Sequence, residues 1–274
     1  MSAPLLEVRG LTVRYPLGRR PLIGRGQQFD ALAEVSVAVE EGAAVGVVGE
    51  SGSGKSTLAR AVLGLVRPSG GAVHWCGERI DDAGRARWRA LRRELQVVFQ
   101  DPFGSLDPRM SAGASVREAL EALEGSTDPA TDAVRIAQAF LEVGLDPALA
   151  GRYPHELSGG QCQRVAIARA TIVRPRLLVC DEAVSALDAS VQAQIVNLLR
   201  SLADRHGMAL LFISHNLAVV RHLCSRAVVL WRGRLVEEGP CEALFGAPQQ
   251  PYTRSLIEAV PRMPPLQRPP QHAG

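Results

Sequence analysis

The stretch Gly49-Glu50-Ser51-Gly52-Ser53-Gly54-Lys55-Ser56-Thr57 decides the fold of this chain. It holds the single lysine of a sequence that is otherwise rich in arginine. Nucleotide bias in the genome can produce an arginine-rich composition, but it does not explain one retained lysine. Lysine ends in a compact ammonium on a flexible stem, whereas the broad planar fork of arginine does not fit a tight loop. Lys55 is therefore predicted to be retained for its shape.

The sequence on either side of this stretch, called here the phosphate loop (Gly49–Thr57), predicts a strand before it and a helix after it. Ala43–Val48 is a continuous apolar run, and Ser56–Leu65 has helical character. Glycines let successive backbone N–H groups point at phosphate oxygens, and the helix N-terminus adds a positive end. Lys55 is then expected to reach the β and γ phosphates of a nucleotide, and Ser56 to bind Mg²⁺. The alternative is a glycine-rich turn with an exposed lysine.

Length and composition are those of an ordinary globular protein. The chain has 274 residues, of which 46% are apolar and 22% charged, and its net charge is +3. This small charge gives no reason to expect nucleic acid as a partner. The apolar run Met208–Val220 is broken by polar residues, and no run reaches the length of a membrane span. The N-terminus does not resemble a secretory signal, and the five cysteines are scattered, so we expect a cytoplasmic protein with buried or inert thiols.

The alternation of apolar runs and helical patterns predicts a parallel sheet covered by helices. An all-helical pattern between Phe103 and Arg152 predicts an inserted helical lobe. Pro16–Gln28 is expected to be a surface insertion, and the chain beyond Pro261 a proline-rich tail. The predicted strands are Leu6–Tyr15, Glu34–Val39, Ala43–Val48, Leu177–Cys180 and Ala209–Ile213, and the predicted helices include Val116–Leu123, Ala133–Val143, Ser158–Ile172 and Val191–Arg205.

Two carboxylates, Asp181 and Glu182, follow directly after the predicted strand Leu177–Cys180. This places them at the carboxyl end of the sheet, where open α/β folds bind their ligands. Asp181 suits the Mg²⁺ shell, and Glu182 suits general-base work on an attacking water. Taken alone, two solvated acids at a strand end would be an equally good explanation. The presence of the phosphate loop favours the functional interpretation.

A second glycine-rich segment, Leu157-Ser158-Gly159-Gly160-Gln161, opens a predicted helix and so offers a second phosphate site. With the phosphate loop and the acidic strand end, it resembles the signature of the nucleotide-binding subunits of ATP-binding cassette (ABC) transporters, over about Leu6 to Glu238. The resemblance implies an α/β fold: a P-loop NTPase (RecA-like) core with an N-terminal antiparallel β subdomain and an inserted all-helical signature subdomain at about 101–170. It implies an ABC ATPase domain over 1–245 and an importer-type extension with the proline-rich tail over 246–274.

The same resemblance implies roles for single residues. Tyr15 is expected to stack on adenine, Asp188 to touch the opposite subunit, and His215 to contact the γ phosphate. Gln100 is expected to link the Mg²⁺ and water site to a membrane partner. The implied catalytic residues are Glu182, His215 and Gln100, and the implied Mg²⁺ ligands are Ser56, Gln100 and Asp181. The implied ATP-binding residues are Tyr15, Gly49, Glu50, Ser51, Gly52, Ser53, Gly54, Lys55, Ser56, Thr57, Ser158, Gly159, Gly160, Gln161 and Asp188.

Two distant segments, Phe99–Met110 and Pro251–Pro261, resemble the ATPases of dipeptide, oligopeptide and nickel importers. Because signature residues act in trans in this family, the resemblance implies a second ATPase subunit, either a paralogue or a copy of this chain. It also implies two transmembrane permeases, an extracytoplasmic solute-binding protein acting indirectly, and a peripheral position on the cytoplasmic face of the inner membrane.

Two alternatives remain open. Ala183 with Val184 resembles some nickel-importer ATPases, so import of nickel or a metal chelate is possible, and the sequence itself does not encode the solute. The other alternative is a soluble ABC ATPase that works without a permease. Such proteins usually carry a long coiled-coil insertion or a second cassette, and neither is present in this sequence.

Overall fold

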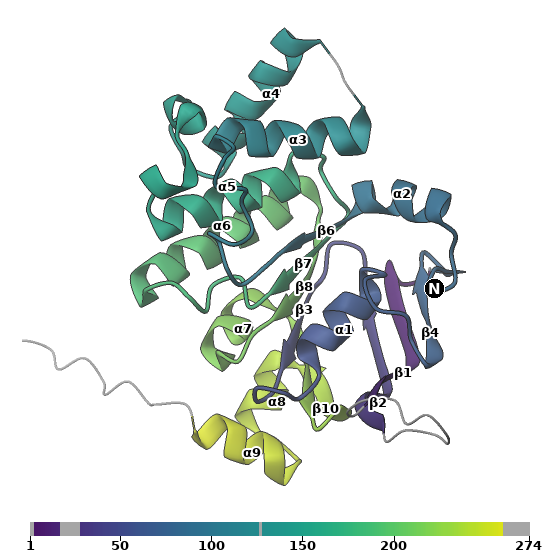
Figure 1. Ribbon diagram of the computed structural model, residues 1–274. Helices are drawn as coiled ribbons and strands as arrows, with labels where there is room; N and C mark the ends of the chain where they lie inside the picture. Colours follow the sequence, from purple (N-terminus) through teal and green to yellow (C-terminus); the bar gives the residue numbers. More distant parts are fainter. Residues whose placement is uncertain (1–2, 17–27, 126–127, 260–274) are drawn as a thin grey trace, which may run out of the picture.

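The computed structural model describes residues 3–16, 28–125 and 128–259 (Figure 1). Its centre is a six-stranded sheet in which four neighbouring strand pairs are parallel and one pair at the edge, β9 with β10, is antiparallel. The predicted α/β fold with a parallel sheet is confirmed. In order across the sheet, the strands are β10 (Arg234–Pro240), β9 (Arg226–Trp231), β3 (Ala44–Val48), β8 (Ala209–Ile213), β7 (Leu177–Asp181) and β6 (Leu95–Val98).

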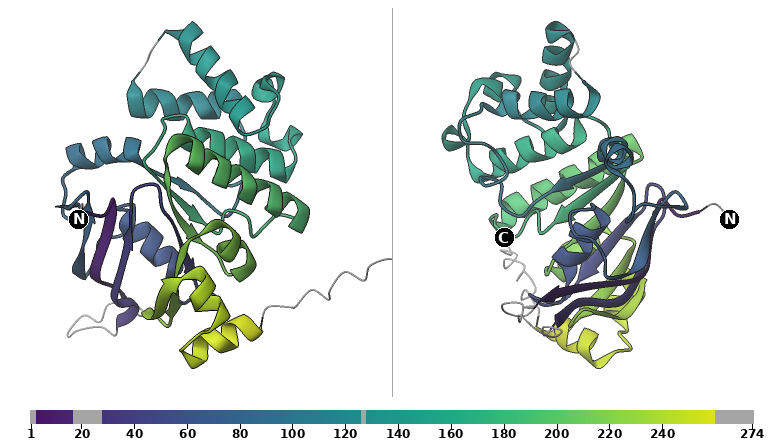
Figure 2. Two further views of the ribbon diagram at one scale, coloured as in Figure 1. Left: turned by 180° about the vertical axis from the view of Figure 1, so that it is seen from behind. Right: turned by 45° about the vertical axis from the view of Figure 1, so that its right-hand side comes forward.

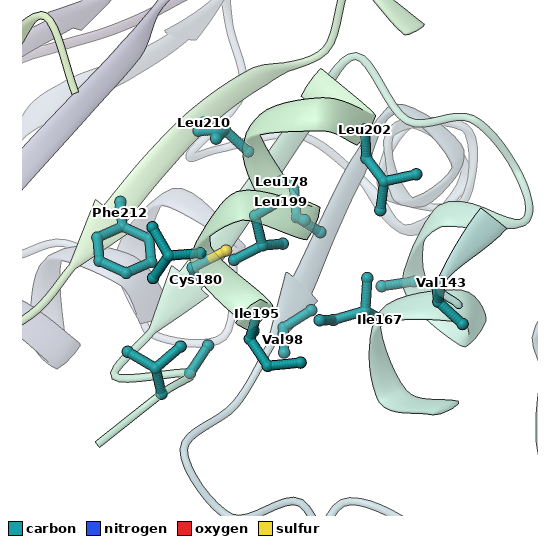
Figure 3. Packing of buried hydrophobic residues seen from close by; sticks show 14 of the residues in the cluster. Val98, Val143, Ile167, Leu178, Cys180, Ile195, Leu199, Leu202, Leu210 and Phe212 are labelled. Carbon is teal, nitrogen blue, oxygen red and sulfur yellow. The ribbon is translucent and has the colours of Figure 1, made fainter. Parts of the chain in front are cut away.

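Two hydrophobic cores cover the two faces of this sheet. On β7, Leu178 and Cys180 belong to one core and Leu177 and Val179 to the other, because successive strand residues point to opposite faces. Figure 3 shows the first core, where Leu199 of α6 packs over the strands. The helices of this first face are α5 (Gly159–Thr171), α6 (Ala189–His206), α7 (Leu217–Leu223) and α8 (Cys241–Gly246).

The second face of the sheet is covered by α1 (Lys55–Val62), by α2 (Arg85–Glu94) and by a smaller antiparallel sheet. In Figure 2, right, the purple N-terminal strands lie on the same side of the central sheet as α1. Pro16 and Gln28 end and begin the two long strands, and the rest of the predicted insertion, 17–27, lies outside the described residues. The smaller sheet has the order β2 (Gln28–Val39), β1 (Leu6–Pro16), β4 (Gly70–Trp75) and β5 (Glu78–Arg79).

The helical region that follows β6 consists of α3 (Ala112–Glu124), α4 (Pro129–Glu142), two short 3-10 helices (Pro147–Gly151 and Pro154–Glu156) and α5. It forms the upper part of the molecule in Figure 1. The helices α3 and α4 begin four residues before the predicted starts at Val116 and Ala133. Ser111 and Asp128 accept capping hydrogen bonds there. The first turns, 112–115 and 129–132, contain no large apolar residue, so the apolar periodicity begins only after them.

After β10 the chain forms α8 and then α9 (Pro251–Glu258), which ends the described part. The proline-rich tail predicted beyond Pro261 lies outside the described residues. Within the described part, no helix has the length and apolar character needed to cross a membrane. The boundaries 1–245, about 101–170 and 246–274 stay a prediction.

Candidate functional site

Sheet topology brings four of the predicted site segments to one edge. The strands β3, β8, β7 and β6 are parallel neighbours, so the segments that follow their carboxyl ends lie side by side. These segments carry the phosphate loop after β3, His215 after β8, Glu182 after β7 and Gln100 after β6. Residues that are far apart in the sequence therefore lie along one edge of the sheet, and Lys55 and His215 both lie within 4.0 Å of Glu182.

The phosphate loop has a backbone that only glycine accommodates at several positions. The φ angles of Gly49, Gly52 and Gly54 are 151°, 79° and 105°, in the region that favours glycine. A Cβ on Gly49 would overlap the carbonyl oxygen of Leu230, and a Cβ on Gly54 would lie 2.6 Å from that of Ala31. The loop is thus packed closely against the end of β9 and against β2.

Lys55 is buried inside the loop that carries it, with 4% of its surface exposed. Its Nζ donates to the carbonyl oxygens of Gly49 and Glu50, both at 2.9 Å, and lies 3.9 Å from Oε1 of Glu182. Burial lowers the pKa of Lys55, and the negative charges of Glu182 and Asp181 oppose that shift. The ammonium is therefore held in a small pocket of oxygens at the place where a nucleotide's phosphates are predicted to bind.

Ser56 and Asp181 place two hard oxygen ligands side by side. The Ser56 hydroxyl donates to Oδ1 of Asp181 at 2.9 Å, and Asp181 is 8% exposed at the end of β7. Burial raises the pKa of Asp181 most strongly, the Ser56 hydrogen bond lowers it, and the nearby Glu182 charge raises it again. A hydroxyl beside a buried carboxylate fits a magnesium ion, which prefers oxygen ligands. The charge of the ion would balance the negative charge of the buried carboxylate.

Glu182 lies between Lys55 and His215. Its Oε2 is 3.7 Å from Nδ1 of His215, while its Oε1 faces Lys55. The φ of Glu182 is 52°, an uncommon value for a residue with a side chain, and its N–H donates to the Ile213 carbonyl at 3.0 Å. The strained turn follows the end of β7 and places the carboxylate between Lys55 and His215, where it can accept a proton from a bound water.

The predicted signature segment is not part of this cluster. Ser158 caps α5: its Oγ accepts from the Gln161 N–H at 3.3 Å, and Gln161 Oε1 accepts from the Ser158 N–H at 2.9 Å. A Cβ on Gly160 would lie 2.8 Å from Val191, so glycine allows the close packing of α5 on α6. The first turn of α5 therefore presents an exposed Ser158 and two glycines away from the chain's own phosphate loop.

Two other predicted site residues also lie apart from Lys55. Asp188 is the N-cap residue of α6, is exposed and makes no capping hydrogen bond within the described chain. Tyr15 lies near the end of β1, opposite Phe29 of β2, with its ring exposed. Sequence reasoning missed the residues that support the loop from behind, Leu230 and Tyr252. The turn sequence that follows Leu230 could have marked this residue as lying at a strand end. No sequence signal apart from the family resemblance marks Tyr252.

Comparison with known proteins gives the same family. A model of the ABC transporter family matches residues 32–185, and a model of the oligopeptide/dipeptide transporter C-terminal region matches residues 236–273. The oligopeptide transport ATP-binding protein OppF of Haemophilus influenzae is 44% identical over 94% of this chain and 78% of its own length. The glutathione import ATP-binding protein GsiA of Escherichia coli is 47% identical over 98% of this chain, but over only 43% of its own length.

Solved structures of similar fold are ATP-binding cassettes. The cassette MJ0796, in a dimeric post-hydrolysis state bound to ADP and Pi, has a TM-score of 0.76 and 28% identity over 86% of this chain and 98% of its own. The cassette cbiO1 from Clostridium perfringens, part of the transporter complex cbiONQ, has a TM-score of 0.76 and 26% identity, covering 89% and 91%. Sequence, fold and site agree, and the chain is an ATP-binding ATPase of the ABC transporter family.

Proposed function

We propose that this chain is the ATP-hydrolysing subunit of an importer that moves peptides across the cytoplasmic membrane. The observation that carries the proposal is the match of residues 236–273 to the C-terminal region of oligopeptide and dipeptide transporters. The named relatives support it, since OppF serves oligopeptide transport and GsiA imports glutathione, which is itself a short peptide.

In the proposed reaction, Glu182 accepts the proton of the attacking water, and His215 beside it contacts the γ phosphate. The phosphate-loop N–H groups and Lys55 neutralise the charge that develops on the phosphate oxygens. Ser56, Asp181 and Gln100 are the residues that would hold Mg²⁺, and Tyr15 the one that would stack on adenine. The 3.7 Å and 3.9 Å distances from Glu182 to His215 and Lys55 support this division of roles.

We further propose that the site is completed by a second ATPase subunit. Ser158 and Asp188 are exposed and lie apart from Lys55, so they are free to contact a nucleotide held by another subunit. The similar cassette MJ0796 is a dimer with ADP and Pi, which supports the arrangement. The partner is a paralogue or a second copy of this chain, and the pair would enclose two ATP molecules.

The permease contact is proposed to lie beside Gln100. Phe99 precedes Gln100 and Phe103 follows it by three residues, and both expose aromatic rings that a partner could cover. Phe103 also lies next to the first turn of α5, at van der Waals distance from a Cβ built on Gly159. Through this surface, nucleotide-driven movement would be transmitted to a permease of a transporter with two transmembrane permeases, and this chain would be bound peripherally on the cytoplasmic face of the membrane.

Uptake of labelled solutes tests the proposal. A strain that lacks this gene is complemented with the wild-type gene or with Glu182→Gln, and the import of a labelled oligopeptide and of labelled nickel is measured. Restoration of peptide uptake by the wild type alone supports the proposal. Restoration of nickel uptake without peptide uptake would favour the metal importer to which Ala183 and Val184 point. Recovery of the chain only in soluble complexes, with neither solute affected, would favour a non-transport ATPase.

A further inference from the structure

A tyrosine of the C-terminal helix α9 contacts the phosphate loop. The Tyr252 hydroxyl oxygen accepts a hydrogen bond from the Glu50 N–H at 3.1 Å, across a separation of 202 positions in the sequence. The Tyr252 ring packs against Trp231, with the ring centroids 5.4 Å apart and the planes tilted by 32°. The guanidinium of Arg232 lies 4.8 Å from the centroid of the same Trp231 ring. The tyrosine hydroxyl is therefore aimed at the loop by a fixed aromatic support.

The Glu50 N–H and the Gly49 carbonyl belong to one peptide unit, which is planar and rigid. Lys55 Nζ donates to that carbonyl at 2.9 Å, while Tyr252 accepts from that N–H. The peptide is thus bound at both ends, by the amine that is predicted to reach the phosphates and by the C-terminal helix. Consecutive hydrogen bonds through one amide strengthen each other. Rotation of the peptide would break both bonds at once.

The structure behind the loop leaves little freedom for the backbone. Gly49 packs directly against the Leu230 carbonyl, one residue before the Trp231 that supports the Tyr252 ring. Further along the turn, the Gly233 N–H donates to the Ser53 carbonyl at 3.0 Å. The β9–β10 turn therefore holds one part of the loop, and Tyr252 holds the Gly49–Glu50 peptide.

The helix α9 is anchored without the Tyr252 hydroxyl. The Glu237 carboxylate on β10 accepts hydrogen bonds from the N–H groups of Gln249 at 2.8 Å and Gln250 at 3.1 Å, just before α9 begins. Burial alone would raise the pKa of Glu237, but these two N–H groups help to bring it below its ordinary value. Removal of the Tyr252 hydroxyl should therefore leave the helix in place and release only the loop peptide.

We infer that Tyr252 is a positioning residue for ATP binding: its hydroxyl fixes the Gly49–Glu50 peptide and so preorganises the phosphate loop. The inference rests on the ATPase activity of the family and does not depend on the transported solute. The loop is then ordered before ATP binds, so ATP binding does not cost the conformational entropy of ordering the loop. The C-terminal extension thereby sets the affinity of the site for nucleotide, although it contributes no group to the phosphates.

The test is Tyr252→Phe in the full-length chain, with Ser255→Ala as the matched control. Ser255 lies on the same helix and its hydroxyl contacts only the Tyr252 carbonyl among the hydrogen bonds of the described residues, so the control removes a hydroxyl without touching the loop. Titration calorimetry with ATP in the absence of Mg²⁺ measures the dissociation constant without hydrolysis. Tyr252→Phe is expected to weaken ATP binding by about twofold to tenfold, the effect of one lost hydrogen bond, and the control by less than about twofold.

Two further measurements separate positioning from simple stability. In steady-state hydrolysis the variant should show a raised KM for ATP and a kcat within about twofold of the wild type, because the lost contact acts on binding. Amide hydrogen exchange should be faster at Glu50 and unchanged at the Ser53–Gly233 contact. Unchanged affinity and unchanged Glu50 exchange would overturn the inference, and so would a lowered melting temperature with ATP affinity intact.

Discussion

Replacement of Lys55 by arginine keeps the positive charge and tests whether shape matters. The Lys55 side chain is 4% exposed, and its Nζ lies 2.9 Å from two loop carbonyls, those of Gly49 and Glu50. An arginine must place a larger planar group in the same space. Overpacking of a tight site costs about 1–3 kcal/mol. If that cost is carried into the transition state, at about 1.36 kcal/mol per tenfold change, hydrolysis falls roughly 5- to 150-fold.

The assay is release of inorganic phosphate at saturating ATP by the purified full-length chain with its partner subunit. Thermal melting of Lys55→Arg is measured in parallel, so that a folding defect is not read as a catalytic one. Lys55→Ala serves as the comparison that removes the charge. The reasoning from shape would be refuted by a folded Lys55→Arg variant that hydrolyses ATP at the full wild-type rate.

Three further predictions depend on which groups are buried and which are exposed. Asp181→Asn should melt at a higher temperature than the wild type at pH 7 without nucleotide. The pKa of Asp181 is raised, chiefly by burial, so the charge of the carboxylate opposes folding above the folded-state pKa, and the difference in melting temperature should vanish below about pH 4. A lower melting temperature of the variant at pH 7 would contradict this. Of the five cysteines, all of which lie in the described residues, only Cys76 is exposed, and burial raises the pKa of Cys180 to about 12 and that of Cys241 to about 11. A thiol reagent at pH 8 should therefore modify the wild type quickly and Cys76→Ser slowly. Fast labelling of the variant would be inconsistent with the fold. Leu199→Ala, at a fully buried position in Figure 3, should lower the free energy of unfolding in urea by about 2–5 kcal/mol, and a loss below about 1 kcal/mol would argue against this core.

The site edge could be predicted from sequence because its signals are local. Apolar runs such as Ala209–Ile213 end where the polar site residues begin, and the strand β8 has the predicted bounds. Once the strands are assigned to one parallel sheet, their carboxyl ends must lie together. Asp181 and Glu182 were therefore placed correctly at this edge without knowledge of the strand order, whereas His215 was assigned through the family resemblance alone.

Elements with mixed signals were not predicted. β4 begins with Gly70 and Gly71, and β10 contains a glycine and ends in a proline, all residues depleted in strands. These strands form because neighbouring strands supply hydrogen-bond partners, which no local pattern reveals. The burial of the cysteines was predicted only in part. Four are buried as expected, but Cys76 is exposed on the turn between β4 and β5, two elements that were not predicted.

Contacts between distant segments were the least predictable part of the site. The hydrogen bond from Glu50 to Tyr252 joins residues on opposite ends of the sequence, and the support of Gly49 by Leu230 spans most of the chain. Sequence patterns identify which residues carry the chemistry. Only the folded chain shows which residues hold them in place.

Hydrolysis by Glu182→Gln tests the central claim, that the carboxylate between Lys55 and His215 is the general base for ATP hydrolysis. The substitution keeps the size of the side chain and removes its ability to take up a proton. We predict a fall in the hydrolysis rate of about 10² to 10⁴, the effect of losing a general base, with ATP binding retained. A Glu182→Gln variant that binds ATP and hydrolyses it at the wild-type rate would contradict the account.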